Sequence, residues 1–189
     1  MAYWLFQGNP KYYRIIDGIR DFTQMPWLVT RYAKEMQPGD GVLVWMSGKD
    51  AGVYAIAEII EVPKPMKDLP DIGYWVDTSP LGEKPFATIR FTDKLLDRPL
   101  LRSELMKDSV LQSLIVLRQP NSTNFKVTAT EWQRVYELRS EGWCWLCGGG
   151  GPLRQIMAIT GHASLASLTS YLNLEQRAAG DALLGFFGG

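Results

Sequence analysis

Two apolar runs joined by a glycine-flanked turn, within residues 42–62, constrain the fold more than any other stretch of the sequence. The runs at 42–46 (VLVWM) and 53–62 (VYAIAEIIEV) have the aliphatic and aromatic content of buried strands. Gly48 and Gly52 border the turn between them, an arrangement that predicts a β-hairpin. Because both runs are more apolar than strands with one solvated face, we expect this hairpin to lie inside a small closed sheet.

Composition narrows the class of protein. The 189 residues suffice for one good core and an appendage, and 46% of them are hydrophobic. No apolar run approaches the length of a membrane span, the N-terminus lacks a signal-peptide pattern, and only 2 cysteines are present. We therefore expect a cytoplasmic protein with no membrane partner. The formal net charge of +0 argues against a broad electrostatic nucleic-acid binder, but it leaves room for a local basic patch beside a pocket.

Shorter patterns predict the remaining elements. Apolar spacing and turn signals predict strands at 2–7 and 86–91 and helices at 11–20, 30–36 and 131–139, with short helical turns within 100–107. Thr128 and Glu131 form a capping signature at the start of the last helix. The intervening loops are expected at 21–28, 63–83 and 118–125.

Four segments carry a family resemblance: YWLFQGNPKYY at 3–13, MPWLVTRY at 25–32, PGDGVLVWMSGKDAGVYAIAEI at 38–59, and VLRQPNSTNFKVTATEW at 116–132. In this order and spacing they resemble an EVE domain, a member of the PUA-like superfamily related to the YTH domains. The resemblance implies an α+β fold over residues 1–139, with a β-barrel of five or six strands and peripheral helices. It also implies binding of a modified base that is turned out of the nucleic-acid helix into an aromatic cage, as in the reader modules of modification-dependent restriction systems.

Tryptophans supply the aromatic faces that such a cage needs. Flipping a base costs a few kcal/mol, and stacking on aromatic rings returns about 1–3 kcal/mol per base. Trp27 and Trp75 fall in predicted loops, and their resemblance to the YTH relatives implies that they hold the two cage positions. Trp45 lies at the mouth of the predicted hairpin, and we expect it to converge with Trp27 and Trp75 in one cleft there; packing inside the barrel is the alternative. Trp4, inside a predicted strand, is expected in the core.

Polar and basic side chains complete the predicted site. The candidate readers of the base edge are Asn9, Ser47, Gln119 and Asn124, and the candidate phosphate contacts are Lys11, Arg31 and Arg118. Each group has a simpler interpretation. Asn9 can cap a helix and Asn124 can close its own loop. Lys11 and Arg31 can be ordinary solvated charges.

The character of the chain changes after Arg139, in a tail defined by residues 140–189. Residues 134–148, with the pair Cys144 and Cys147, resemble the opening of an HNH nuclease. Two cysteines and one histidine fall short of the four ligands of a structural zinc, so no metal is expected. Residues 153–172 resemble the C-terminal end of a tyrosine recombinase, but the arginine-bearing segment that should precede them is replaced by a glycine run.

The sequence thus predicts a non-enzymatic reader domain with no cofactor, followed by a tail that combines two incomplete fragments and forms short helices. Without their catalytic partners, His162 and Tyr171 are expected to be structural residues. The favoured partner is DNA that carries a modified base, most of all a modified cytosine, and a nuclease subunit is a further possible partner. Three alternatives stay open. The first is a module that binds modified RNA. The second is a zinc nuclease or recombinase, or an inactive remnant of such a fusion, and the third is an interaction domain with a degenerate pocket.

Overall fold

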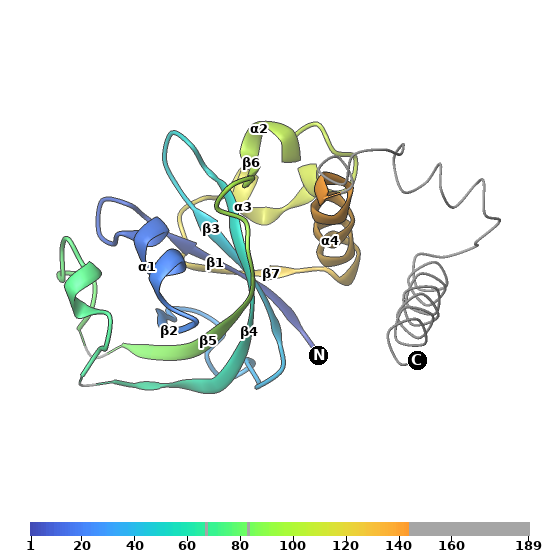
Figure 1. The fold of residues 1–189 in the computed structure, drawn as a ribbon. Helices are drawn as coiled ribbons and strands as arrows, with labels where there is room; N and C mark the ends of the chain where they lie inside the picture. Colours follow the sequence, from blue (N-terminus) through green and yellow to red (C-terminus); the bar gives the residue numbers. More distant parts are fainter. Residues whose placement is uncertain (67, 83, 144–189) are drawn as a thin grey trace, which may run out of the picture. The chain divides into compact units, whose positions relative to one another are not determined.

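The computed structural model describes residues 1–66, 68–82 and 84–143 (Figure 1). The chain divides after Tyr136 into two units, and the fold below is that of the first, Met1–Tyr136. Among the described residues, no helix is long and apolar enough to cross a membrane. The cysteine pair, His162, Tyr171 and the predicted tail helices lie outside the described residues.

A seven-stranded mixed sheet forms the centre of the first unit. Six strands follow the order β2-β5-β4-β3-β1-β7, and the two-residue β6 pairs with β4. β1 runs parallel to β3, and all the other pairs are antiparallel. The strands are β1 (Tyr3–Gly8), β2 (Gln24–Leu28), β3 (Gly41–Met46), β4 (Gly52–Pro65), β5 (Pro85–Lys94), β6 (Leu100–Leu101) and β7 (Asn124–Val127).

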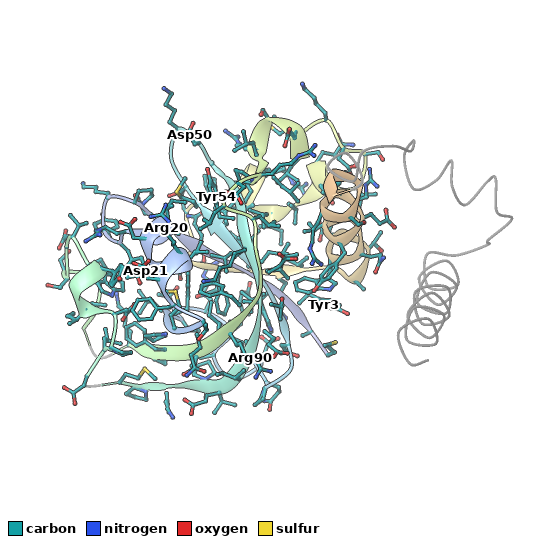
Figure 2. All side chains as sticks on the ribbon, in the orientation of Figure 1. Tyr3, Arg20, Asp21, Asp50, Tyr54 and Arg90 are labelled. Carbon is teal, nitrogen blue, oxygen red and sulfur yellow. The ribbon has the colours of Figure 1, made fainter. Side chains whose placement is uncertain are left out.

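The predicted hairpin is confirmed as β3 and β4, which pair in the register Val42↔Ala57 and Leu43↔Ile56. Their position between β1 and β5 buries residues 41–45 of β3 and 52–57 of β4 on both faces, which explains the apolar character of these segments. Glu61 and Val62, near the end of β4, are exposed. At the turn, the Tyr54 hydroxyl donates to the Asp50 carbonyl oxygen at 2.8 Å (Figure 2).

The expected α+β class is confirmed, but the sheet of the described residues has seven strands rather than five or six, and strand pairing among them does not close it into a barrel. Its two terminal strands, β2 and β7, are joined by a side chain instead. The Oδ1 atom of Asn124, on β7, accepts the Thr30 amide at 2.8 Å, and its Nδ2 donates to the Leu28 carbonyl at 3.3 Å. A hydrogen bond between the hydroxyls of Thr30 and Thr123 adds to this seam.

Helices and helical turns cover the sheet. The α-helices are α1 (Ile15–Asp21), α2 (Arg102–Leu105), α3 (Ile115–Arg118) and α4 (Ala129–Trp143), and the 3₁₀ turns are η1 (Ile72–Tyr74) and η2 (Leu111–Ser113). The capping signature of α4 is confirmed: the Glu131 carboxylate accepts the Thr128 amide at 2.8 Å, and the Glu131 amide donates to the Thr128 hydroxyl at 3.2 Å.

Two predicted helices are wrong in extent or in kind. The helix expected at 11–20 begins only at Ile15, because the Asn9 carbonyl accepts the amides of Tyr12 and Tyr13 and forms a turn instead. The helix expected at 30–36 is a series of turns. Tyr32 has a φ of +62°, a left-handed conformation that a right-handed helix does not contain.

Two strands were missed within predicted loops. β2 lies inside the expected loop 21–28 and contains Pro26, a residue type that is rare in central strands. It pairs with β5 alone, however, and an edge strand tolerates a proline. β7 begins at Asn124, inside the expected loop 118–125, and pairs with β1 in the register Leu5↔Phe125.

Candidate nucleic-acid interface

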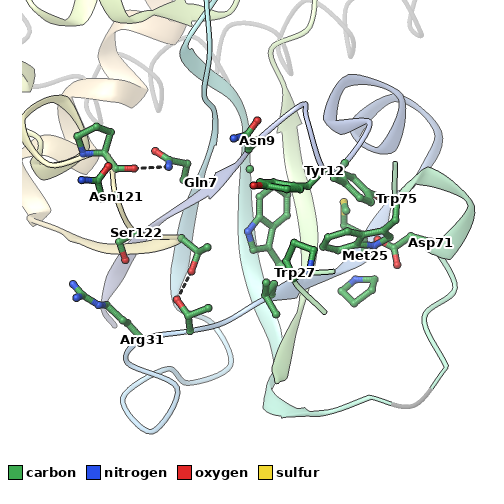
Figure 3. A pocket seen from close by; sticks show the side chains of 18 residues that line it. Gln7, Asn9, Tyr12, Met25, Trp27, Arg31, Asp71, Trp75, Asn121 and Ser122 are labelled. Atoms are coloured by element: carbon green, nitrogen blue, oxygen red, sulfur yellow. Dashed lines mark hydrogen bonds between the residues drawn. The ribbon is translucent and has the colours of Figure 1, made fainter. Parts of the chain in front are cut away.

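A pocket of about 430 Å³ opens beside the end of β1 (Figure 3). Its wall comes from four parts of the chain that lie far apart in sequence. They are the β1 end and following turn (7–9, 12 and 13), β2 and the turn after it (25–28, 30 and 31), the segment around η1 (71, 75 and 80), and the loop before β7 (120–123). Pockets that take small ligands in proteins span about 300–1,000 Å³, so this one is large enough for a nucleobase.

Trp27 forms one aromatic wall from a rigid position. It lies on β2, paired with Ala87 of β5, rather than in the loop expected from the sequence. Its ring stacks on Phe6 with a centroid separation of 6.2 Å, and the residue is only 6% exposed. The sheet and Phe6 therefore fix the orientation of the indole without any ligand.

Trp75 lines the same pocket from the segment that follows η1. Its backbone forms an isolated β-bridge with Tyr13, and its ring meets the Tyr13 ring edge-on at 5.1 Å. The adjoining amide of Val76 donates to the Tyr12 carbonyl at 2.8 Å, which ties this segment to the turn after β1. The loop position predicted for Trp75 is confirmed, and the residue is partly buried.

The structure brings Trp27 and Trp75 to one pocket, but it does not bring Trp45 there. Trp45 is 2% exposed on β3, and the pocket wall does not include it. The expected convergence of all three tryptophans is therefore wrong for Trp45, because both of its neighbouring strands bury it. Sequence reasoning missed two further aromatic residues of the wall, Tyr12 and Tyr13. The tyrosine pair directly after the Asn9-Pro10 turn was the available signal.

The four predicted polar readers are placed differently from one another. Asn9 lines the pocket, and its Oδ1 accepts the Lys11 amide at 2.9 Å. Ser47, Gln119 and Asn124 are not part of the pocket wall. Asn124 is 1% exposed and belongs to the seam between β2 and β7, while Gln119 is exposed before the wall segment 120–123.

Of the predicted phosphate contacts, only Arg31 lines the pocket. Lys11 lies between the pocket residues Asn9 and Tyr12 in the sequence but is exposed, and its ammonium is 5.7 Å from the centre of the Tyr12 ring. Arg118 ends α3, and its guanidinium donates to the Ser113 carbonyl at 2.7 Å.

Several buried polar atoms of the pocket residues lack a hydrogen-bond partner among the described residues. They are the Gln7 Oε1, the Tyr13 hydroxyl, both carboxyl oxygens of Asp71 and the Trp75 indole nitrogen. The Gln7 amide is oriented, because its Nε2 donates to the Pro120 carbonyl at 2.8 Å. Buried polar groups in native proteins are nearly always paired, and three of these groups lie together, because the Tyr13 hydroxyl and the Trp75 indole N–H act on the Asp71 carboxyl group. The Gln7 Oε1 stands apart from this group as an acceptor without a partner among the described residues.

Asp71 is the least expected member of this cluster, and nothing in its sequence context set it apart. It is 1% exposed and stands directly before η1, yet its side chain does not cap that turn. Burial raises the pKa of Asp71, although the nearby Tyr13 hydroxyl and Trp75 indole N–H favour the charged form. Burial and the nearby Asp71 in turn raise the pKa of Tyr13, which keeps that hydroxyl protonated.

The described residues contain no group of three or more His, Cys, Asp or Glu side chains that could hold a metal ion. The pocket itself presents aromatic faces, hydrogen-bonding groups and the Arg31 guanidinium.

Residues 2–138 match the family model of the EVE domain. The chain belongs to the EVE domain family. The EVE region takes in every wall segment of the pocket. No curated protein matches the chain.

Solved structures share the fold of this EVE domain. A hypothetical protein from Leishmania major is 23% identical, with a TM-score of 0.59, over 76% of this chain and 97% of its own. A protein from Pseudomonas syringae is 24% identical, with a TM-score of 0.56, over 73% of this chain and 99% of its own. Human THYN1, solved in complex with DNA that contains 5-methylcytosine, is 15% identical, with a TM-score of 0.54, over 73% of this chain and 97% of its own.

Proposed function

We propose that this EVE domain binds nucleic acid that carries a modified base and receives that base, flipped out of the helix, between Trp27 and Trp75. The favoured target is DNA with a modified cytosine. The observation that carries the proposal is the coincidence, in one pocket of about 430 Å³, of aromatic walls and buried polar atoms without partners. A flat polar ligand such as a base satisfies both features at once.

The energetics suit this mode of binding. Extrusion of a base costs a few kcal/mol, and stacking against aromatic rings returns about 1–3 kcal/mol per base. Trp27 is held in place by the sheet before binding, so little side-chain entropy is lost when the base stacks on it. Arg31 at the pocket edge supplies a charge for a backbone phosphate, a contact that positions the nucleic acid without reading its sequence.

The complex of human THYN1 with 5-methylcytosine DNA supports cytosine as the favoured base, since the two proteins share a fold. We propose binding without catalysis for the EVE domain. A nuclease that acts on the bound DNA would then be a separate partner, as in a restriction system.

A binding titration by fluorescence anisotropy tests the proposal. It uses duplexes that differ only in one central base, with cytosine, 5-methylcytosine or N6-methyladenine at that position, and a matched RNA that carries N6-methyladenosine. We expect the 5-methylcytosine duplex to bind roughly fourfold more tightly than the unmodified duplex, since one buried methyl group contributes about 0.8 kcal/mol. Tighter binding of the RNA would instead identify a reader of modified RNA.

A further inference from the structure

Asp71 carries a buried carboxyl group that takes part in no helix cap and in none of the ion pairs of the described residues. It is 1% exposed and lines the pocket, and neither carboxyl oxygen has a hydrogen-bond partner among the described residues. A buried, unpaired carboxyl group costs stability, so its presence needs a reason other than folding.

The usual structural reason does not apply. An aspartate directly before a helical turn commonly caps it by accepting an amide with its side chain. Before η1, the Tyr74 amide donates to the Asp71 backbone carbonyl at 2.9 Å instead, and no side-chain cap forms. Helix capping therefore does not use the carboxyl oxygens, and the groups that act on them are the Tyr13 hydroxyl and the Trp75 indole N–H.

We infer that Asp71 reads the Watson–Crick edge of the bound base by accepting a hydrogen bond from its exocyclic amino group. This inference rests on the proposed function and names the chemical class of base that the pocket takes. Cytosine and adenine present an amino group beside a ring nitrogen acceptor, whereas thymine and uracil present a carbonyl oxygen at the same place. A carboxyl group therefore favours the amino-bearing bases, because it would face a second lone pair on a thymine or uracil.

The surroundings of Asp71 fit this role. The Tyr13 hydroxyl and the Trp75 indole N–H, both buried and unpaired, lie near the carboxyl group and can donate to it. A carboxyl oxygen has two lone pairs, so these donors can orient the group while acceptor capacity remains for the base. Burial favours the protonated acid, which can also donate to the ring nitrogen next to the amino group of cytosine or adenine.

A double-mutant cycle tests the contact. The protein is either the wild type or Asp71→Leu, which has a similar size but no hydrogen-bonding group. The duplex carries either 5-methylcytosine or 5-methyl-2-pyrimidinone, which is the same base without its amino group. For the wild type we expect removal of the amino group to weaken binding roughly 5- to 150-fold, the cost of leaving a buried partner unpaired. For Asp71→Leu we expect the two duplexes to bind within about twofold of each other.

Asp71→Asn is the matched control, since its amide oxygen can still accept the amino group, and it should retain most of the discrimination. If the Leu variant gives no cooperative melt, Asp71→Ala takes its place in the cycle. If removal of the amino group from the base weakens binding equally in the wild type and in the variant, the inference is overturned and Asp71 is a positioning residue for Trp75. A wild type that does not prefer 5-methylcytosine to cytosine would instead refute the proposed function, a separate result that comes from the titration with the unmodified duplex.

Discussion

Replacement of Trp75 by alanine separates the binding role of this residue from a packing role. Trp75 is partly buried, follows η1, and contacts Tyr13 through a ring edge at 5.1 Å. Truncation of a fully buried tryptophan costs about 3–5 kcal/mol of unfolding free energy, through lost burial and the cavity left behind. We expect Trp75→Ala to cost less, under about 2 kcal/mol, because its ring has fewer buried contacts to lose.

The loss in binding should exceed the loss in folding. One aromatic wall of the proposed cage disappears, and with it about 1–3 kcal/mol of stacking, which corresponds to a roughly 5- to 150-fold weaker dissociation constant for the modified duplex. Anisotropy titrations with modified and unmodified duplexes measure this loss, and urea unfolding measures the change in stability.

Two other tryptophans serve as references. Trp27→Ala should lower both the affinity for the modified duplex and the stability of the fold, because Trp27 lines the pocket, stacks on Phe6 and is only 6% exposed. Trp45→Phe should reduce stability and leave the preference for the modified base unchanged, since Trp45 is buried outside the pocket. If Trp75→Ala destabilises the fold as much as Trp27→Ala while the preference for the modified base persists, Trp75 is a packing residue and the cage is refuted.

Three further changes probe the site and its support. Asp71→Asn should stabilise the protein at pH 7 but not near pH 4. Burial raises the pKa of Asp71, so the stability of the wild type falls as the pH rises from about 3.9, the pKa in the unfolded chain, through the pKa in the folded protein. Urea unfolding midpoints measured between pH 4 and pH 7 test this prediction. A stability difference between the two proteins that does not change with pH would contradict the burial argument. Asn124→Ala should lower the free energy of unfolding in urea by about 1–3 kcal/mol, because the Thr30 amide loses its partner. Gln119→Ala, at an exposed position, should change it by less than about 0.5 kcal/mol. Equal effects of the two substitutions would contradict the role of Asn124 in joining β2 to β7. Arg31→Ala should weaken binding of modified and unmodified duplexes alike and reduce the slope of log affinity against log salt concentration by about 1. Arg90→Ala, outside the pocket wall, should change neither quantity. A loss of affinity confined to the modified duplex would make Arg31 a base reader.

The sequence predicted the centre of the fold because that part depends on local patterns. The hairpin of β3 and β4 followed from two apolar runs and a glycine-flanked turn, and the start of α4 followed from the capping pair Thr128 and Glu131. The resemblance to the EVE family was also sufficient to place Trp27 and Trp75 at one pocket.

What the sequence could not predict depends on contacts between distant segments. β2 is a strand only because β5 pairs with it, which overrides the signal of Pro26. The turns after residue 30 form where Asn124, far along the chain, accepts the Thr30 amide. Trp45 has the local sequence of a strand end at a pocket mouth, but the neighbouring strands bury it.

Asp71 illustrates the same limit at the site. In the sequence it is one acidic residue among several in a proline-rich loop, with no spacing that marks it. Only the folded chain shows that it is buried beside Tyr13 and Trp75 and that its carboxyl oxygens have no partner there.

The central claim is that the pocket recognises a modified base, and its most direct test compares two duplexes that differ by one methyl group. With the full chain and fluorescence anisotropy at fixed salt, the dissociation constants are measured for a duplex with one 5-methylcytosine and for the same duplex with cytosine. We expect roughly fourfold tighter binding of the methylated duplex, from the burial of one methyl group, and loss of that preference in Trp75→Ala. Equal affinities for the two duplexes, with Trp75→Ala indistinguishable from the wild type, would contradict the central claim.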